Sequence, residues 1–279
     1  MIFKSYAKIN LSLKIKKKLK KNNLHDISSH FCLINLYDVI QIKKFSGKKD
    51  LIKFKGKFGN YVKNSKNSIK TILSILRKKK VISRYYNIVI QKNIPVFAGL
   101  GGGTSNAAFL LRHLIKDKID QNLLKICSKN IGSDFKLFFH NQGFMKSLDN
   151  IIPLKKRENL FFLLVYPNIK CSTKNIYSRV KINTINHKIN FRKKVAPDRY
   201  LKSIANETND LQLIVEKKHL QVRKLIKEIE QIKGCYFSRL TGSGSVCYGV
   251  FKNKDEANKA LTQVKIKYPK YWSSFAKTI

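Results

Sequence analysis

The stretch from Pro95 to Ala108 constrains the fold most strongly, because it places a run of glycines between a predicted strand and a predicted helix. The β-branched residues 88–90 predict the strand, and apolar residues recur at helical spacing from Ala107 to Ile115. A glycine has no Cβ atom to keep a ligand away from the backbone, and the unpaired amides at a helix start favour an anion. The sequence therefore predicts a phosphate-binding loop whose natural ligand is a polyphosphate.

The amino-acid sequence of this loop excludes two other nucleotide-binding motifs. It does not end in Gly-Lys-Ser/Thr, and no acidic residue of the dinucleotide-binding kind follows about twenty residues further on. Asp117 and Asp120 come too early for that role. The alternative is a turn that only connects a strand to a helix. Five consecutive small or hydroxylated residues follow Leu100, which is more than a connecting turn needs and favours phosphate binding.

The charge balance is strongly positive, since 58 Lys and Arg against 16 Asp and Glu give a net charge of +42. Such a charge attracts nucleic acid, anionic membranes and polyphosphates alike. The lysines are spread along the chain and do not gather in one arm or tail. A generally basic surface is therefore the favoured interpretation, and functional RNA binding is the alternative.

The composition predicts a soluble globular protein. A chain of 279 residues can form one large or two moderate domains, and 43% hydrophobic with 11% aromatic residues argues against disorder. No apolar run approaches the roughly 20 residues that span a bilayer. The start of the chain lacks the apolar segment of a signal peptide. We therefore expect a cytoplasmic protein with no membrane partner.

Cysteine and histidine spacing predicts no metal site. The five cysteines are scattered and never occur as Cys-x-x-Cys, and the six histidines form no cluster such as His-Glu-x-x-His. Scattered cysteines in a reducing compartment are expected to be small buried apolar residues and to form no disulfides. The sequence therefore predicts no protein-ligated metal.

Hydrophobic periodicity predicts an α+β chain in two lobes, residues 1–152 and 153–279. The alternating residues 9–15 predict a half-buried strand, which would place Lys8 and Asn10 on one face opposite the core. The Lys- and Asn-rich segment 181–199 is expected to be poorly ordered. Further strands are predicted in 31–42, 51–54, 160–165, 246–251 and 272–276, and helices in 69–76, 123–131, 220–232 and 257–264.

Three motifs, in this order and spacing, resemble those of the GHMP kinases. Residues 5–13 resemble the amino-terminal motif, and residues 239–247 resemble the third, which is a second glycine loop. This resemblance covers nearly the whole chain. It implies the two-lobed GHMP kinase fold, with a ribosomal-protein-S5-like N-terminal domain and a ferredoxin-like C-terminal domain. The central motif is carried by Pro95, Gly99, Leu100, Thr104, Ser105 and Ala107.

The resemblance implies that ATP is the co-substrate and arrives with Mg²⁺, which phosphates and water would largely hold. Asn67 and Lys92 match positions near the adenine in one branch of this family. The residues expected to bind ATP are Asn67, Lys92, Pro95, Gly99, Leu100, Gly101, Gly102, Gly103, Thr104 and Ser105.

The resemblance also implies a catalytic pair, Lys8 and Asp134. Asp134 would accept the proton of the attacking hydroxyl or align it, while Lys8 neutralises charge near the transferred group. From the residues alone, Asp134 reads as a helix N-cap after Gly132 and Lys8 as one solvated lysine among many. The family commonly has a proline soon after the aspartate, whereas this chain continues Phe-Lys-Leu, so the aspartate is expected to sit somewhat differently.

The longer spelling of the central motif resembles one branch of the family. Members of that branch phosphorylate the 2-hydroxyl of 4-diphosphocytidyl-2-C-methyl-D-erythritol in non-mevalonate isoprenoid biosynthesis. His25 matches the branch, and Leu24 stands where a tyrosine is expected to stack on the cytosine. The residues expected to bind this substrate are Asn10, His25, Thr173, Tyr177, Thr241, Gly242 and Gly244.

Two alternatives remain open at this point. The chain could be another GHMP kinase acting on homoserine, mevalonate or a sugar, and the retained cytosine-site residues argue against this. It could instead be a basic RNA-binding protein on the same scaffold, and the presence of both Lys8 and Asp134 argues against that. We expect a monomer or weak homodimer with no specific nucleic-acid partner.

Overall fold

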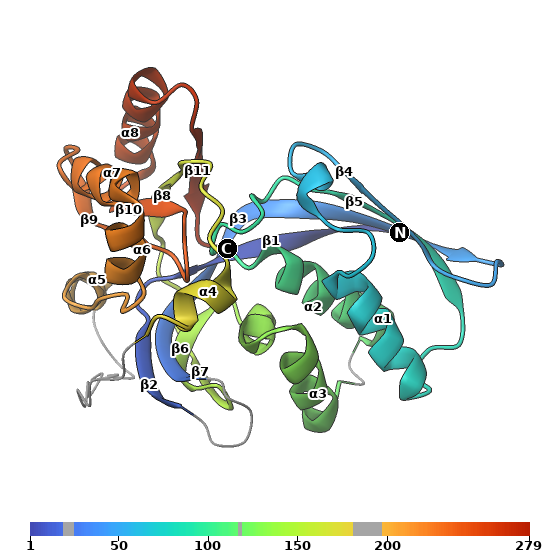
Figure 1. The fold of residues 1–279 in the computed structure, drawn as a ribbon. Coiled ribbons are helices and arrows are strands. Elements are labelled where there is room, and N and C mark those ends of the chain that lie inside the picture. The colour runs from blue at the N-terminus through green and yellow to red at the C-terminus, as the bar shows by residue number, and fades with distance from the viewer. Residues whose placement is uncertain (19–24, 117–118, 181–196) are drawn as a thin grey trace. The chain divides into compact units, whose positions relative to one another are not determined.

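The computed structural model describes residues 1–18, 25–116, 119–180 and 197–279 (Figure 1). The chain forms two compact units that interleave along the sequence. Each unit is described by itself. Unit 1 consists of Met1–Lys8, Asn35–Val96 and Gly101–Phe139, and unit 2 of Ile9–Ile34, Phe97–Leu100 and His140–Ile279.

Unit 1 packs three helices against a sheet. Strand β1 (Ile2–Asn10) pairs with β3 (His25–Phe45), whose second half runs antiparallel to β5 (Tyr85–Gln91), and β5 runs parallel to β4 (Leu51–Lys55). Figure 1 shows the three helices together on one side of these strands. The helices are α1 (Ser68–Lys78), α2 (Gly102–Ile115) and α3 (Gln121–Ile131), and the 3-10 helices are η1 (Gly59–Tyr61) and η2 (Ser133–Phe139).

Periodic apolar residues explain why these helices pack on the sheet. Ile69, Ile72, Leu73 and Leu76 of α1 are fully buried, as are Leu110 and Leu111 of α2. Gly132 ends α3 at a positive φ of 152°. The stop after Ile131 agrees with the end predicted from the sequence.

Unit 2 contains a set of antiparallel strands and a second sheet. The first half of β3 pairs antiparallel with β2 (Lys14–Lys18) and β6 (Gln142–Ser147), and β6 pairs with β7 (Asn150–Pro153). The second sheet is antiparallel in the order β11-β8-β10-β9. Its strands are β8 (Phe161–Tyr166), β9 (Cys235–Leu240), β10 (Cys247–Phe251) and β11 (Trp272–Lys277).

Two helices of unit 2 cover this second sheet. Helix α7 (Leu220–Glu230) packs on β9 and β10, and α8 (Lys254–Lys267) packs on β8, β10 and β11. Val222, Leu225 and Ile229 belong to the apolar core formed there. The remaining helices of this unit are α4 (Thr173–Tyr177), α5 (Pro197–Ala205) and α6 (Gln212–Lys218).

The predicted half-buried strand 9–15 is wrong in two respects. β1 ends at Asn10 and β2 begins at Lys14, so the predicted single strand is interrupted between them. Lys8 and Asn10 do not face away from the core, since each is 1% exposed. The alternation of polar and apolar residues misled the prediction because these polar side chains are buried with partners: Lys8 with Asp134, and Asn10 with Ser29.

Other expectations fare differently. The cysteines among the described residues are free, and all except the half-buried Cys235 are buried. No helix in the described part of the chain is long and apolar enough to cross a membrane. The segment expected to be poorly ordered lies outside the described residues up to 196, and α5 begins at Pro197. The compact units do not follow one cut at residue 152, so that domain boundary stays a prediction.

Candidate active site

The glycine-rich loop leads into the first turn of α2 as the sequence predicts. Gly101 is the N-cap residue with a φ of 70°, and the first intrahelical hydrogen bond runs from Ser105 N to Gly101 O at 2.8 Å. An α-helix leaves the amides before that first bond without an intrahelical partner, and its dipole favours an anion beside them. The geometry at the start of α2 therefore suits phosphate oxygens, and phosphate binding there stays a prediction.

Two neighbours shape this helix start. A Cβ atom on Gly101 would lie 2.9 Å from Phe138 Cζ and 3.2 Å from Lys8 Cε, so only a glycine fits this close approach at positive φ. On another side, the Ser68 hydroxyl at the start of α1 donates to Gly103 O at 2.6 Å. The loop is thus held against β1 and α1, and Lys8 lies directly beside it.

Lys8 and Asp134 form an ion pair with 3.0 Å between Lys8 Nζ and Asp134 Oδ2. The Lys8 side chain is 2% exposed and the Asp134 side chain 25% exposed, so the carboxylate keeps access to solvent and to a ligand. The lysine is therefore not one of the many solvated lysines of this chain. The position of this pair within unit 1, next to Gly101, suits a reaction at the phosphate-binding loop.

Asp134 is not the N-cap that its sequence suggested. It is the second residue of η2, and Gly132 precedes that helix. A Cβ atom on Gly132 would lie 3.6 Å from Thr104 Oγ1, which puts the residues before Asp134 near the first turn of α2. Phe135, Leu137 and Phe138 are fully buried. This apolar packing fixes η2 in a chain that lacks the proline common in the family.

Asn67 and Lys92 have structural partners in unit 1. Asn67 is the N-cap of α1, where its side chain accepts a hydrogen bond from Lys70 N at 3.0 Å. It also lines a groove of about 430 Å³ along α1 and α3 whose wall includes Lys66, Lys70 and Asn130. Lys92 is 2% exposed and its ammonium pairs with Asp38. Burial lowers the pKa of Lys92, and the Asp38 charge opposes that shift. Their role in ATP binding stays a prediction.

Most of the predicted substrate-binding residues lie in unit 2, around the second glycine loop. Asn10 N donates to Thr241 Oγ1 at 3.1 Å, and Gly242 O accepts from Asn209 Nδ2 at 2.8 Å. Gly244 N donates to Thr241 O at 2.9 Å, which closes the loop on itself. Asn10, Thr241, Gly242 and Gly244 are therefore brought together.

The first half of the central motif contacts the same loop. A Cβ atom on Gly99 would lie 2.1 Å from Thr241 O, so this close approach requires glycine. Val246 N donates to Ala98 O at 3.2 Å, which fastens the two segments together within unit 2. Gly99 and Leu100 thus lie in unit 2, whereas Gly101, Gly102, Gly103, Thr104 and Ser105 lie in unit 1.

His25, Thr173 and Tyr177 form a second group in unit 2. The His25 and Tyr177 rings are stacked, with centroids 6.0 Å apart and planes 26° apart. Thr173 Oγ1 is 3.0 Å from Ser243 Oγ, which links helix α4 to the second glycine loop. Leu24 lies outside the described residues. An aromatic pair beside hydroxyl groups can stack on a planar base and bind its polar edge.

The sequence prediction missed two residues that the structure places beside the phosphate-binding loop. Asp38 is fully buried and Asn106 is 2% exposed, and both are hydrogen-bonded to Lys92. A carboxylate inside the apolar run 31–42 and an amide directly before the apolar helical run 107–115 were the available signals. A buried polar residue in such a position needs partners. Among the described residues, no group of three His, Cys, Asp or Glu side chains could hold a metal ion.

Comparison with known proteins identifies the family. Models of the GHMP kinases N terminal domain and of the GHMP kinases C terminal match residues 60–134 and 198–270. The 4-diphosphocytidyl-2-C-methyl-D-erythritol kinase of Pelagibacter ubique (strain HTCC1062) is 34% identical over 99% of this chain and 98% of its own length. The enzyme of the same name from Clostridioides difficile (strain 630) is 31% identical over 91% of this chain and 88% of its own.

Solved structures agree on the fold. A 4-(cytidine 5'-diphospho)-2C-methyl-D-erythritol kinase superposes over the full length of both chains with a TM-score of 0.73 at 19% identity. A homoserine kinase from Cytophaga hutchinsonii covers the whole chain and 94% of its own length with a TM-score of 0.61 at 15% identity. These likenesses confirm the α+β GHMP kinase fold, and the curated relatives add the branch. The chain belongs to the GHMP kinase family and, within it, groups with the 4-diphosphocytidyl-2-C-methyl-D-erythritol kinases.

Proposed function

We propose that this protein transfers the γ-phosphoryl group of ATP to the 2-hydroxyl of 4-diphosphocytidyl-2-C-methyl-D-erythritol, a step of non-mevalonate isoprenoid biosynthesis. The observation that carries the proposal is the 3.0 Å ion pair of Lys8 with Asp134 beside the glycine-rich start of α2. The relatives that bear the name of this kinase support it over nearly the whole chain.

In this reaction the hydroxyl oxygen of the alcohol attacks the γ-phosphorus, and the bond from that phosphorus to the bridging oxygen of ADP breaks. Asp134 accepts the hydroxyl proton through its partly exposed carboxylate, and Lys8 balances the negative charge that gathers there. The amides at the start of α2 hold phosphate oxygens. Most of the acceleration comes from this positioning and charge stabilisation.

ATP would be accompanied by Mg²⁺, which screens the phosphate charges and keeps water and phosphate oxygens as its main ligands. This mode of binding suits the donor set of unit 1, where Asp134 and the hydroxyl of Thr104 stand near the loop. Asn67 and Lys92, with the loop residues from Pro95 to Ser105, complete the proposed ATP-binding set.

The cytidine part of the substrate would be recognised in unit 2. Tyr177 would stack on the cytosine, and His25 and Thr173 would bind its polar edge. Asn10, Thr241, Gly242 and Gly244 would contact the phosphates and the erythritol. We also propose that the protein acts in the cytoplasm as a monomer or weak homodimer, without a specific nucleic-acid or membrane partner.

The test is a coupled assay for ADP with ATP, Mg²⁺ and a panel of alcohols that includes homoserine, mevalonate and galactose. We expect turnover with 4-diphosphocytidyl-2-C-methyl-D-erythritol, here called the cytidyl alcohol, and with none of the other alcohols. A preference for an alcohol with no nucleotide part would leave a GHMP kinase of another branch. Binding of RNA with no turnover of any alcohol would favour the basic RNA-binding alternative.

Asp134→Asn tests the catalytic assignment. The change keeps the shape of the side chain but removes the charge and the proton acceptor, so kcat should fall by roughly two to four orders of magnitude while both substrates still bind. Asp50→Asn is the matched control, because Asp50 also pairs with a cation in unit 1, Arg77. Near-normal turnover of Asp134→Asn would show that Asp134 has only a structural role.

A further inference from the structure

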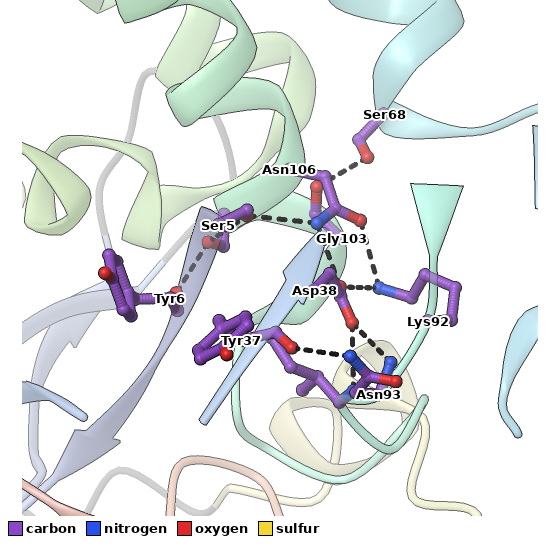
Figure 2. Close-up of polar contacts among 11 residues, drawn as sticks. Ser5, Tyr6, Tyr37, Asp38, Ser68, Lys92, Asn93, Gly103 and Asn106 are labelled. Carbon is purple, nitrogen blue, oxygen red and sulfur yellow. Dashed lines mark hydrogen bonds and ion pairs between the residues drawn. The ribbon is translucent and has the colours of Figure 1, made fainter. Parts of the chain in front are cut away.

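A buried network of polar side chains lies under the phosphate-binding loop (Figure 2). It consists of Ser5, Asp38, Lys92, Ser105 and Asn106, all of them in unit 1 and each at most 2% exposed. We call these five residues the buried network. None of the steps of the proposed reaction uses Asp38, Asn106 or Ser5.

Asp38 is the acceptor at its centre. Its Oδ1 accepts hydrogen bonds from Asn93 N at 2.8 Å and Ile94 N at 2.9 Å, at the point where β5 passes into the glycine-rich loop. Its Oδ2 accepts from Lys92 Nζ and from Asn106 Nδ2, the latter at 2.9 Å. Burying a carboxylate is costly unless it is paired and hydrogen-bonded, and this one has a cation and three N–H donors.

The amide of Asn106 has only one orientation that satisfies its neighbours. Lys92 can only donate, so Asn106 Oδ1 faces Lys92 Nζ at 3.0 Å. The Asp38 carboxylate can only accept, so Asn106 Nδ2 faces Asp38 and also donates to Ser5 Oγ at 3.0 Å. An aspartate here would place a second carboxylate against Asp38, and an apolar residue would leave Lys92 and Asp38 each short of a partner.

The network connects α2 with β1, the two elements whose relative position matters for the proposed reaction. Ser105 and Asn106 stand in the first turns of α2, with only Thr104 between them and the glycines. Ser105 Oγ donates to Tyr6 O at 2.6 Å and lies 2.7 Å from Ser5 Oγ, and both of these partners are on β1, the strand that carries Lys8. A Cβ atom on Gly102 would lie 3.4 Å from Lys92 Nζ, so the ammonium sits just beneath the helix start.

A buried ion pair contributes little net stability compared with well-packed apolar residues, but its directional bonds can impose one geometry. Here those bonds join the end of β5, the strand β1 and the start of α2. The Ser68 hydroxyl holds the same turn of α2 from α1 through Gly103 O. The geometry of the phosphate-binding amides relative to Lys8 is therefore set from beneath by the buried network.

We propose that Asn106 is a positioning residue for ATP: together with Asp38, Lys92 and Ser5 it fixes the first turn of α2 so that its amides meet the ATP phosphates beside Lys8. Asn106 acts through the helix and does not contact the reacting atoms. This inference rests on the proposed function only in taking ATP as the ligand, and it does not depend on which alcohol is phosphorylated.

The test is Asn106→Leu, which keeps the size of the side chain and both charges of the Asp38–Lys92 pair. We measure the ATP dissociation constant by calorimetry without any alcohol, and then the KM values and kcat. ATP affinity and kcat/KM for ATP should fall roughly 10- to 100-fold, the scale of an effect from slight misplacement. The KM of the alcohol should stay within a factor of about two, a split that a loss of folded protein cannot produce.

Asp50→Leu is the matched control. Asp50 accepts from both terminal nitrogens of the Arg77 guanidinium group and from Tyr86 N, so the variant also loses partly buried hydrogen bonds in unit 1, but none of them involves α2. It should lose thermal stability without a change in ATP affinity. Equal losses of ATP affinity in the two variants would overturn the proposal, because the effect would then be a general loosening of unit 1.

Ser5→Ala is the milder second variant, should Asn106→Leu not fold. It removes only the hydroxyl that joins Asn106 to Ser105, and we expect ATP affinity to fall about three- to tenfold on the same scale. Wild-type ATP affinity in folded Ser5→Ala and Asn106→Leu proteins would overturn the proposal. Failure of the proposed function would show differently, as wild-type protein that binds ATP but does not phosphorylate the cytidyl alcohol.

Discussion

The adjacent glycines Gly102 and Gly103 at the start of α2 differ in how much room the structure leaves for a side chain. A Cβ atom on Gly102 would lie 2.9 Å from Ile94 Cγ2, so a larger residue there disturbs the packing of unit 1. A Cβ atom on Gly103 would meet only Ser68 Oγ, at an ordinary 3.6 Å. The sequence places both residues in the expected ATP-binding set without distinguishing them, whereas the structure shows that only at Gly103 does a larger side chain leave the packing undisturbed.

Gly103→Val should therefore weaken ATP binding while the protein stays folded. The branched side chain would stand where phosphate oxygens approach the backbone, and we expect the dissociation constant to rise on the order of tenfold. Calorimetry with ATP gives the constant, circular dichroism checks the fold, and Gly103→Ala is the control with a smaller effect. Unchanged affinity in folded Gly103→Val would remove phosphate binding from this loop.

His30 makes the stability of the protein sensitive to acid. Burial lowers its pKa from 6.5 to about 4, while its ring packs on Phe144 and its Nδ1 lies 3.1 Å from Ser12 Oγ. Because the folded pKa lies below the unfolded one, the unfolded state binds more protons between pH 6.5 and 4. Stability is therefore complete above the unfolded pKa and declines as the pH falls through this window.

His30→Gln should flatten that decline. The lowered pKa corresponds to about 3 kcal/mol of unfolding free energy lost between neutral pH and pH 4. The variant does not show this loss, because the glutamine at position 30 does not titrate. Urea unfolding of both proteins at pH 7, 5.5 and 4.5 gives the slopes. Parallel slopes for the two proteins would mean that His30 is already accessible to protons in the folded state.

At the scale of elements, periodicity predicted the regular helices and strands well because their apolar residues face one core. The helices at 69–76 and 123–131 and the strand at 246–251 are confirmed in α1, α3 and β10. The hairpin β6–β7 was not predicted, since its buried half, Gln142 to Met145, has little alternation. The break between β1 and β2 was missed because polar side chains there are buried with partners from distant segments, which no local pattern reveals.

The candidate site divides in the same way. The glycine loop follows from local chemistry, because a strand, four glycines and a helix start are enough to predict an anion site. Lys8 and Asp134 lie 126 positions apart in the numbering, and only the family motifs brought them together before the structure showed their 3.0 Å contact. The roles of Asp38 and Asn106 could be recognised only from the structure, because they depend on the hydrogen bonds that these two residues make with each other and with Lys92.

The short helix α4 leads to a prediction, at this scale, about specificity for the cytidine substrate. Its five residues carry both Thr173, bonded to Ser243, and Tyr177, stacked on His25. Stacking of an aromatic residue on a base is worth about 1–3 kcal/mol. Tyr177→Ala should therefore raise the KM of the cytidyl alcohol roughly five- to hundredfold and leave the ATP KM unchanged. Steady-state kinetics that show normal use of the cytidyl alcohol would take Tyr177 out of the substrate site.

At the scale of the whole molecule, the net charge of +42 opposes the folded state. Ion pairs such as Lys14 with Asp210 and Lys267 with Glu228 offset only a few of these charges. Repulsion among the remaining lysines is long-ranged at low salt, where the Debye length is about 30 Å at 0.01 M, and short-ranged at 0.15 M, where it is about 8 Å. Unfolding lets the charges move apart, so low salt should favour the unfolded chain.

The free energy of unfolding in urea should consequently be higher at 0.15 M than at 0.01 M NaCl, by on the order of 1–3 kcal/mol. Urea is the suitable denaturant because it is uncharged, and KCl in place of NaCl separates screening from binding of a particular ion. If stability fell with added salt, attraction within the buried and half-buried ion pairs, such as Lys8 with Asp134, would outweigh the repulsion. The net positive charge would then not lower the stability of the folded state.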